Sequence, residues 1–250
     1  CSSDLQVAII DSNQVFSDSL VAFSPCENIN VTFAILQSRV HEQWTRFLGS
    51  SIGDTLRYTP SDCFESFPFP KLKNKNLKLV EHCEKNHFEI LETLGYKYLE
   101  FRSKIMIEFN NGLTNIYNRF DSPKENNNYI LELRNLHEEL DKTLLDAYGW
   151  SDISTLCGFS LDYLEIDETL EISEDIMKRL ESGNLFFWDA EEAIQFENQI
   201  QIAFPSKKKL PWRYKFPNEI NELIISRLLE LNENYFSDGD NLSENFVNTK

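Results

Sequence analysis

Residues 31–70 constrain the fold more than any other stretch, because they combine a helical stripe with a sharp turn and a proline-rich exit. The apolar side chains of this helix recur three or four residues apart, which places them on one side and predicts that this side is buried. They are Phe33, Leu36, Val40, Trp44 and Phe47. Arg39, Gln43 and Arg46 share a separate stripe of the same predicted helix.

The second half of this stretch predicts a turn, a strand and a stiff extended arm. Gly49 and Gly53 end the helix, because glycine tolerates the left-handed backbone that a helix end commonly uses. Residues 55–59 follow as a short strand, with Arg57 and Tyr58 exposed near its end. In residues 67–70, Phe-Pro-Phe-Pro, each proline forces an extended backbone, so both phenylalanines are available for burial.

The fold class expected from the whole chain is an α+β N-terminal piece, part of a larger domain, followed by a mainly α-helical domain. Residues 1–23 alternate apolar and polar side chains and predict two or three strands. From residue 76 the spacing becomes helical, and the clearest helix spans residues 130–148. Its buried stripe is predicted to be Ile130, Leu133, His137, Leu140, Leu144 and Tyr148, while Glu138 and Asp141 belong to a solvated face.

Other segments of the second part are shorter. Residues 113–120 are predicted to be a connector, residues 159–163 a strand, and residues 211–214 a turn that docks on the core. The predicted domains are therefore residues 1–75, residues 76–235 and an acidic disordered tail at residues 236–250. Because the chain begins at Cys1 without an initiating methionine, we expect it to be a fragment of a longer protein.

Five blocks between Leu36 and Ile220 carry a resemblance to a known family. They are LQSRVHEQWTRF, LRYTPSDCFESFPFP, GLTNIYNRF, ELRNLHEELDKTLLDAYGW and LPWRYKFPNEI, in that order. Together they resemble the C-terminal target-recognition and helical region of adenine-specific (N6) DNA methyltransferases, above all the single-chain Type IIG restriction-modification enzymes and related phage-defence methylases. The resemblance implies a segment that recognises double-stranded DNA beside an upstream methyltransferase domain of the same chain.

The chain lacks the sequence motifs of catalysis. It contains no Pro-Pro pair to grip a flipped adenine and no glycine-rich strand-to-helix turn for S-adenosylmethionine. No glutamate is followed two residues later by lysine, as a metal-dependent nuclease of this type requires. We therefore expect no catalytic residue and no cofactor in this segment, and we expect S-adenosylmethionine to bind elsewhere in the parent protein. The sequence leaves open whether that parent protein also cleaves DNA.

Candidate DNA contacts follow from residue type and clustering. Arg57 and Tyr58 are candidates for the groove, because arginine and tyrosine contact base edges and stack. The candidates for phosphate contact are Arg39, Arg46, Lys71, Lys73 and Lys75, although residues 71–78 fit a solvated linker equally well. Asn118 and Arg119 are of the types that contact adenine and guanine edges, yet they also suit helix caps and packing.

The net charge of −17 supports a competing interpretation. Residues 1–80 hold 7 lysines and arginines against 8 acidic residues, whereas residues 81–250 hold 17 against 33. The acidic excess therefore lies in the second part, and it favours a helical protein-interaction module that does not bind DNA.

Cysteines and hydropathy add further expectations. Five irregularly spaced cysteines are typical of free thiols in a reducing cytoplasm, and His82, Cys83 and His87 lack the second ligand pair of a zinc site. No apolar run is long enough to span a membrane, and no secretion signal is visible, so we expect a cytoplasmic protein without a metal.

Overall fold

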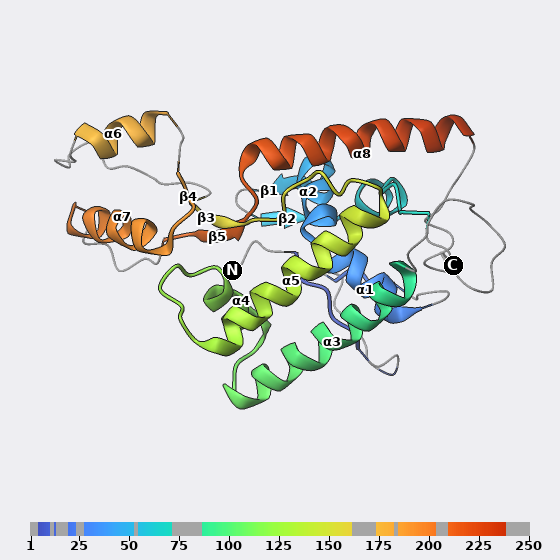
Figure 1. The fold of residues 1–250 in the computed structure, drawn as a ribbon, viewed down its shortest axis with the longest axis horizontal. Coiled ribbons are helices and arrows are strands. Elements are labelled where there is room, and N and C mark those ends of the chain that lie inside the picture. Colours follow the sequence, from blue (N-terminus) through green and yellow to red (C-terminus); the bar gives the residue numbers. More distant parts are fainter. Residues whose placement is uncertain are drawn as a thin grey trace.

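The computed structural model describes residues 5–10, 13, 20–23, 28–52, 55–71, 87–161, 174–182, 185–203 and 210–238. In Figure 1 the long helix α8 (Asn218–Asp238) lies along the top, α5 (Asn128–Ala147) crosses the middle and α3 (His87–Glu108) lies below. A lobe containing α6 (Glu174–Glu181) and α7 (Ala190–Ala203) projects from one end. The expected fold class, an α+β N-terminal piece followed by a mainly helical part, is confirmed.

The helix predicted for residues 33–47 is two helices, α1 (Ile29–Gln37) and α2 (Arg39–Leu48). Ser38 separates them in an extended conformation (φ −65°, ψ 152°), and its hydroxyl accepts a hydrogen bond from the His41 N–H at 3.1 Å. Serine is a preferred N-cap because its oxygen satisfies a free N–H of the first turn. The continuous helix was therefore wrong, and Phe47, expected in the buried stripe, is 54% exposed.

After α2 the chain forms an antiparallel hairpin of β1 (Ser50–Ile52) and β2 (Thr55–Arg57), with Ser50 opposite Arg57. A π-helix, η1 (Pro60–Glu65), leads into the proline arm. Phe67 and Phe69 are buried in the arm, as predicted. Among the described residues between 5 and 23, none belongs to a strand, so the expected N-terminal strands are not seen there.

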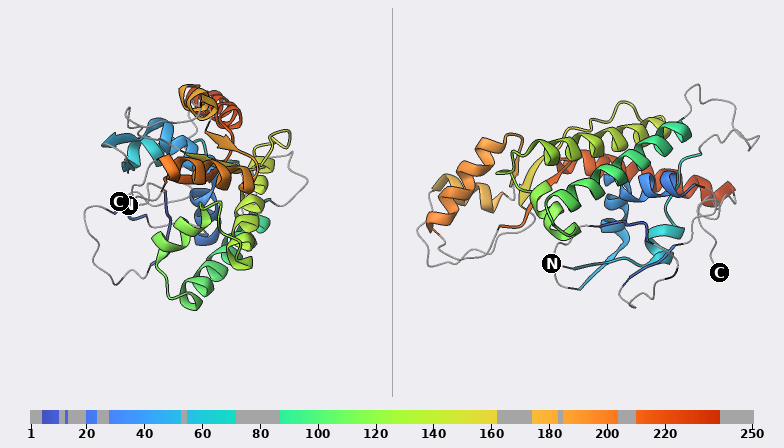
Figure 2. Two further views of the ribbon diagram at one scale, coloured as in Figure 1. Left: turned by 90° about the vertical axis from the view of Figure 1, so that its left-hand side faces the viewer. Right: turned by 90° about the horizontal axis from the view of Figure 1, so that it is seen from below.

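The helical part adds α4 (Leu113–Phe120), which replaces the predicted connector. A three-stranded antiparallel sheet has the order β4 (Phe186–Phe187), β3 (Gly158–Leu161), β5 (Trp212–Lys215). Strand β5 occupies the residues expected to form a docking turn, and Phe159 lies opposite both Phe187 and Tyr214. Figure 2 shows α3 and α5 side by side, with the α6–α7 lobe at one end.

One hydrophobic core joins the two predicted domains. Val31, Trp44 and Phe69 from the N-terminal piece pack in the same cluster as Leu140 and Leu228 from the helical part. Tyr148 at the end of α5 donates a hydrogen bond to the Pro68 carbonyl at 2.9 Å, which ties the arm to the helical part. The predicted boundary at residues 75 and 76 lies outside the described residues, as does the predicted tail beyond Asp238.

Three buried arginines connect the layers of this core. Arg102 of α3 donates to the Val7 carbonyl at 2.8 Å and to Gln37 at 3.1 Å. Arg134 of α5 donates to the Phe120 carbonyl at 2.6 and 2.8 Å. The third, Arg39 of α2, lies at the site described next. Buried charges are stable only where hydrogen bonds and opposite charges compensate them, so the bonds of these arginines fix how the helices sit together.

Candidate functional site

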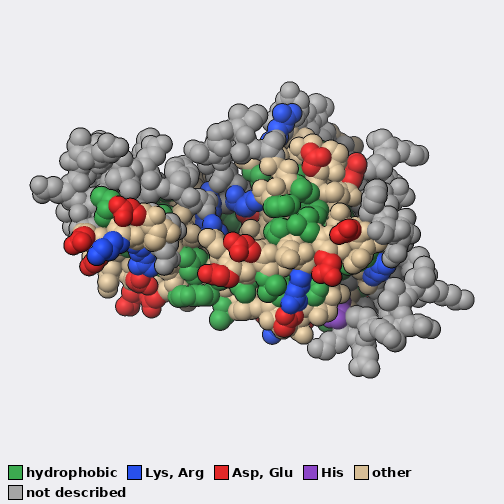
Figure 3. All heavy atoms as spheres, turned by 90° about the horizontal axis from the view of Figure 1, so that it is seen from above, with side chains coloured by type: hydrophobic (Ala, Val, Ile, Leu, Met, Phe, Trp, Pro, Cys, Tyr) green, Lys and Arg blue, Asp and Glu red, His purple; other side chains and the backbone are tan. Residues whose placement is uncertain are grey.

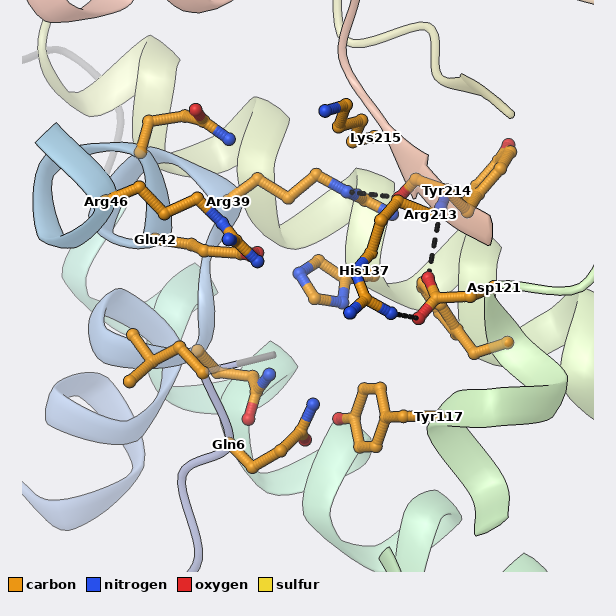
Figure 4. Close-up of a pocket in the computed structure, with 14 residues that line it drawn as sticks. Gln6, Arg39, Glu42, Arg46, Tyr117, Asp121, His137, Arg213, Tyr214 and Lys215 are labelled. Carbon is orange, nitrogen blue, oxygen red and sulfur yellow. Dashed lines mark hydrogen bonds and ion pairs between the residues drawn. The ribbon is translucent and has the colours of Figure 1, made fainter. Parts of the chain in front are cut away.

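A pocket of about 70 Å³ lies where α2, residues 5–6, α4, α5 and β5 meet. Its wall on α2 is a single helical stripe, because Glu42 and Gln43 follow Arg39 by three and four residues, and Arg46 stands three or four residues beyond them. The polar stripe of Arg39, Gln43 and Arg46, which the sequence analysis distinguished from the apolar stripe, therefore lines this pocket. Figure 4 shows Arg39 extending from α2 to Tyr214 of β5, with Glu42 and Arg46 beside it.

Arg39 is the buried centre of the pocket, with 2% of its surface exposed. Its Nη1 donates to Asp141 Oδ2 at 2.7 Å, and its backbone N–H donates to Asp141 Oδ1 at 2.8 Å. Its Nε donates to the Tyr214 carbonyl at 3.4 Å. The guanidinium carbon also lies 5.5 Å from the centre of the Tyr214 ring, within cation–π range.

Asp141 was predicted to lie on a solvated face, and this was wrong, since the residue is fully buried. Its carboxylate satisfies the first N–H of α2 and neutralises Arg39 at once. Burial raises the pKa of Asp141 to about 6, although the Arg39 guanidinium opposes the rise. The carboxylate is therefore ionised at neutral pH.

His137 forms the floor of the pocket, as Figure 4 shows, and it is 4% exposed. Its Nδ1 lies 3.2 Å from the Tyr98 hydroxyl, which in turn lies 2.9 Å from the Tyr117 hydroxyl. Burial and the nearby Arg39 and Arg102 lower the pKa of His137 well below its ordinary value, while the Gln37 backbone opposes this. The ring is therefore neutral at physiological pH.

Strand β5 supplies the opposite wall with two cations, Arg213 and Lys215. They stand two residues apart and thus share one face of the strand. Arg213 Nη1 lies 3.4 Å from Asp121 Oδ2, and the Tyr214 N–H donates to Asp121 Oδ1 at 3.0 Å. Asp121 is the residue directly after α4, so these two contacts attach β5 to the end of that helix.

Of the predicted DNA contacts, the structure brings Arg39 and Arg46 together at this pocket. Arg39 is an internal ion-pair partner there rather than a surface cation. Arg46 is partly exposed and forms an ion pair with Glu42 at 2.7 Å, one turn earlier in α2.

The other predicted contacts lie elsewhere. Arg57 is exposed at the end of β2, whereas Tyr58 is half-buried with its hydroxyl 3.2 Å from His41 Nε2. Asn118 is exposed on α4. Arg119 forms an ion pair with Glu125 at 2.6 Å and lies 4.1 Å from the Phe109 ring centre. Lys71 is exposed, with Nζ 4.7 Å from the Tyr235 ring centre, and Lys73 and Lys75 lie outside the described residues.

Sequence reasoning missed Arg213, Lys215, His137 and Gln6 as members of one site. The WRYK run at residues 212–215 carries a usable signal, because alternation places both cations on one strand face. Interpreting it as a turn concealed that alternation. His137 belongs to the buried stripe of α5 and gives no sign in the sequence that it borders a pocket.

Within the described residues, no group of three or more His, Cys, Asp or Glu side chains could hold a metal ion. Of the cluster considered for zinc, His82 and Cys83 lie outside those residues. No helix in the described part of the chain is long and apolar enough to cross a membrane.

Comparison with known proteins gives one family match. Residues 5–71 match the family model described as "MmeI, target recognition domain". No curated protein and no solved structure matches the chain. The match confirms the resemblance to a restriction-modification target recognition domain for the N-terminal piece, while the resemblance of the helical part stays a prediction. The α2 wall of the pocket lies inside the matched stretch, and the β5 wall lies outside it.

Proposed function

We propose that this chain recognises and positions DNA as part of an S-adenosylmethionine-dependent adenine-specific DNA methyltransferase of a restriction-modification or phage-defence system. The observation that carries the proposal is the match of residues 5–71 to a target recognition domain. The ordered resemblance of five sequence blocks supports the methyltransferase part. The cluster of cations between α2 and β5 supports contact with a polyanion.

Sequence reading is assigned to the exposed end of the β1–β2 hairpin. Arg57 is exposed there, and arginine makes the commonest specific contact with guanine in the major groove. Arg46, Arg213 and Lys215 are assigned to the phosphate backbone, which positions the duplex without reading it. Tyr58 then acts by supporting the hairpin through His41 instead of entering a groove.

The chemistry belongs to another part of the parent protein. Neither an adenine-gripping Pro-Pro loop nor a glycine-rich cofactor turn is present in this chain, so its residues do not fit S-adenosylmethionine. When bound upstream, the cofactor supplies the methyl group. This chain's residues hold the duplex and select the bases around the adenine.

The first test is a titration of the chain with labelled duplex at several salt concentrations. Contact with phosphates predicts that log K falls linearly with log salt, with a slope of about −0.9 for each phosphate neutralised. A slope indicating two or more contacts supports the proposal, and the absence of duplex binding at low salt contradicts it.

The methyltransferase assignment has its own test. The parent protein is expressed in a host that lacks adenine methylation, and the host genome is sequenced by a method that detects N6-methyladenine. We expect one recurrent methylated motif. DNA binding without any methylated adenine would retain DNA recognition and overturn the assignment to a methyltransferase.

The second candidate function is an acidic protein-interaction module. It is favoured by the 33 acidic residues against 17 basic ones in residues 81–250. In Figure 3, which views the molecule from the α8 side, acidic side chains surround an apolar area of the main body, as such a module would present to a partner.

The same titration separates the two functions, since a module without phosphate contacts gives no salt-dependent duplex binding.

A further inference from the structure

We propose that the pocket between α2 and β5 is a binding site for one phosphate group, which its buried Arg39 guanidinium contacts directly. If the phosphate belongs to the DNA backbone, this inference rests on the proposed function. If it is a free phosphate ion, the inference is independent of that function. Both sources share the chemistry of a small tetrahedral oxyanion.

The first observation is an incomplete set of hydrogen bonds at Arg39. Its Nη1 and Nε atoms are used by Asp141 and the Tyr214 carbonyl, but its Nη2 atom is buried without a hydrogen-bond partner. Buried charged donors without an acceptor are rare in folded proteins because they lose their hydration without replacement. A phosphate oxygen in the pocket would supply that acceptor.

Two other residues that line the pocket also have a buried polar atom without a hydrogen-bond partner. His137 Nε2 and Gln6 Oε1 are also buried without hydrogen-bond partners, although both residues border the pocket. A neutral imidazole donates from one nitrogen, so His137 can present Nε2–H to an oxyanion when Nδ1 accepts from the Tyr98 hydroxyl. The Gln6 amide can rotate to present its NH₂ group. Three residues with unsatisfied groups, from α2, α5 and the N-terminal segment, thus border one small space.

The charge balance of the lining favours an anion over a cation. Four cations line the pocket; the lining carboxylates Glu42 and Asp121 offset two of them, and Asp141 offsets a third, Arg39, so one positive charge remains. Each carboxylate pairs with an arginine, Glu42 with Arg46 and Asp121 with Arg213, so it orients that guanidinium. A metal ion would lie among positive groups, whereas an oxyanion would meet a net positive surface.

The size of the space limits the ligand. The pocket volume is about 70 Å³, which is room for a small group such as one tetrahedral oxyanion. A DNA backbone phosphate would reach the pocket from its rim, where Arg46 and Lys215 are partly exposed.

The test compares two lining variants with two matched controls. Lys215→Gln and Arg46→Gln each remove a lining cation, and Arg46 is paired one turn along its own helix. Lys178→Gln removes an exposed lysine paired one turn along α6, and Arg227→Gln removes an arginine paired with Asp152 on the surface. All four variants leave the buried Arg39–Asp141 pair intact, so we expect each of them to fold.

Inorganic phosphate is titrated into the chain by calorimetry, and a crystal is soaked in phosphate to locate the ion. We expect saturable binding at Arg39 Nη2, weakened roughly tenfold in the lining variants, as the loss of one charge-assisted hydrogen bond predicts. The controls should bind as the unaltered chain does. No saturable binding, density for water alone, or equal weakening in lining and control variants would overturn the site.

The duplex titration then identifies the source of the phosphate. A site for a DNA phosphate predicts that phosphate competes with duplex and that Lys215→Gln lowers the salt slope by about one contact. If the chain binds phosphate but Lys215→Gln leaves the salt slope of duplex binding unchanged, the ligand is a free phosphate and the contact with the DNA backbone is overturned. Duplex binding without phosphate binding leaves the proposed function standing while this inference fails.

Discussion

At the scale of single residues, Asp141 has three structural roles. It neutralises Arg39, fixes the direction of that guanidinium and satisfies the first N–H of α2. Because 102 residues separate the two side chains in sequence, the contact joins the matched recognition stretch to the middle of the helical part. A buried ion pair adds little stability over an apolar pair, but the loss of one partner leaves the other charge uncompensated.

Replacing Asp141 by alanine tests this dependence. The Asp141→Ala variant removes both acceptor oxygens, so it leaves the Arg39 guanidinium and the first N–H of α2 without this partner, and we expect the free energy of unfolding to fall by roughly 3–5 kcal/mol. Chemical denaturation monitored by circular dichroism measures the change. Asp152→Ala is the control, because Asp152 pairs with Arg227 on the surface and its loss should change stability little. Equal effects in the two variants would contradict a structural role for the buried pair.

His41 provides a second prediction at this scale. Its Nδ1 lies 3.2 Å from the Leu36 carbonyl, which can only accept, so Nδ1 carries the proton and Nε2 accepts from the Tyr58 hydroxyl. Burial lowers the pKa of His41 to about 4, although the Leu36 and Cys63 carbonyls oppose the change. The unfolded chain then binds more protons than the folded chain between pH 6.5 and 4, so stability falls as the pH falls through this range.

We expect His41 to account for about 2 kcal/mol of stability lost between pH 7 and pH 5. His137 acts in the same direction, whereas Asp141 opposes it, because its raised pKa favours the folded state as the pH falls below 6. Unfolding of the original chain and of His41→Asn is therefore compared at both pH values. The difference between them isolates His41, and parallel losses in both proteins would refute the assignment.

At the scale of elements, α1 and α3 approach closely at one glycine. A Cβ atom added at Gly95 of α3 would lie 2.2 Å from the Asn30 carbonyl oxygen of α1 and 3.3 Å from Ala34 Cβ. The first contact is with backbone, which cannot move away without displacing the helix. Gly95 is thus what permits this packing of the N-terminal piece on the helical part.

Gly95→Ala is expected to lower the free energy of unfolding by about 1–3 kcal/mol, the usual cost of overpacking. Helix propensity alone would favour alanine by about 1 kcal/mol, so the sign of the change separates packing from propensity. Thermal unfolding measures the effect. Gly112→Ala is the control for added volume, since nothing lies within 4 Å of its Cβ atom; because Gly112 is the N-cap of α4, a loss of up to about 1 kcal/mol there reports capping and not packing. Stabilisation at Gly95 would show that the helices are not in close contact there.

The elements also show what sequence periodicity could predict. The stripe of Ile130, Leu133, Leu140 and Leu144 is buried in α5 as expected, because a long amphipathic helix leaves a strong local signal. The break at Ser38 was missed because Phe33, Leu36, Val40 and Trp44 keep helical spacing across it. The burial of Asp141 and the strand at WRYK depend on partners distant in sequence, and local patterns do not contain that information.

At the scale of the whole molecule, the matched N-terminal piece and the helical part form one folded unit around a shared core. Trp44 and Phe69 from the first part pack with Leu140, Phe216 and Leu228 from the second. The lobe has its own cluster around Phe187 and Phe196, and Lys124 and Trp212 connect it to the main body through Glu197. Composition indicated that a large core exists, but only the structure shows that this core crosses the predicted domain boundary.

For the proposed function, that shared core limits how sequence specificity can be exchanged between related proteins. A recombination or an engineered chimera joined near residue 75 would set a foreign α2 against this α5, with Asp141 awaiting an arginine at the position of Arg39. It would also set a foreign α1 against Gly95. Under the proposed function, the unit that can be exchanged is therefore the N-terminal piece together with the helical part, and we expect new specificities to arise by substitution at exposed positions such as Arg57 more readily than by exchange of the first seventy residues.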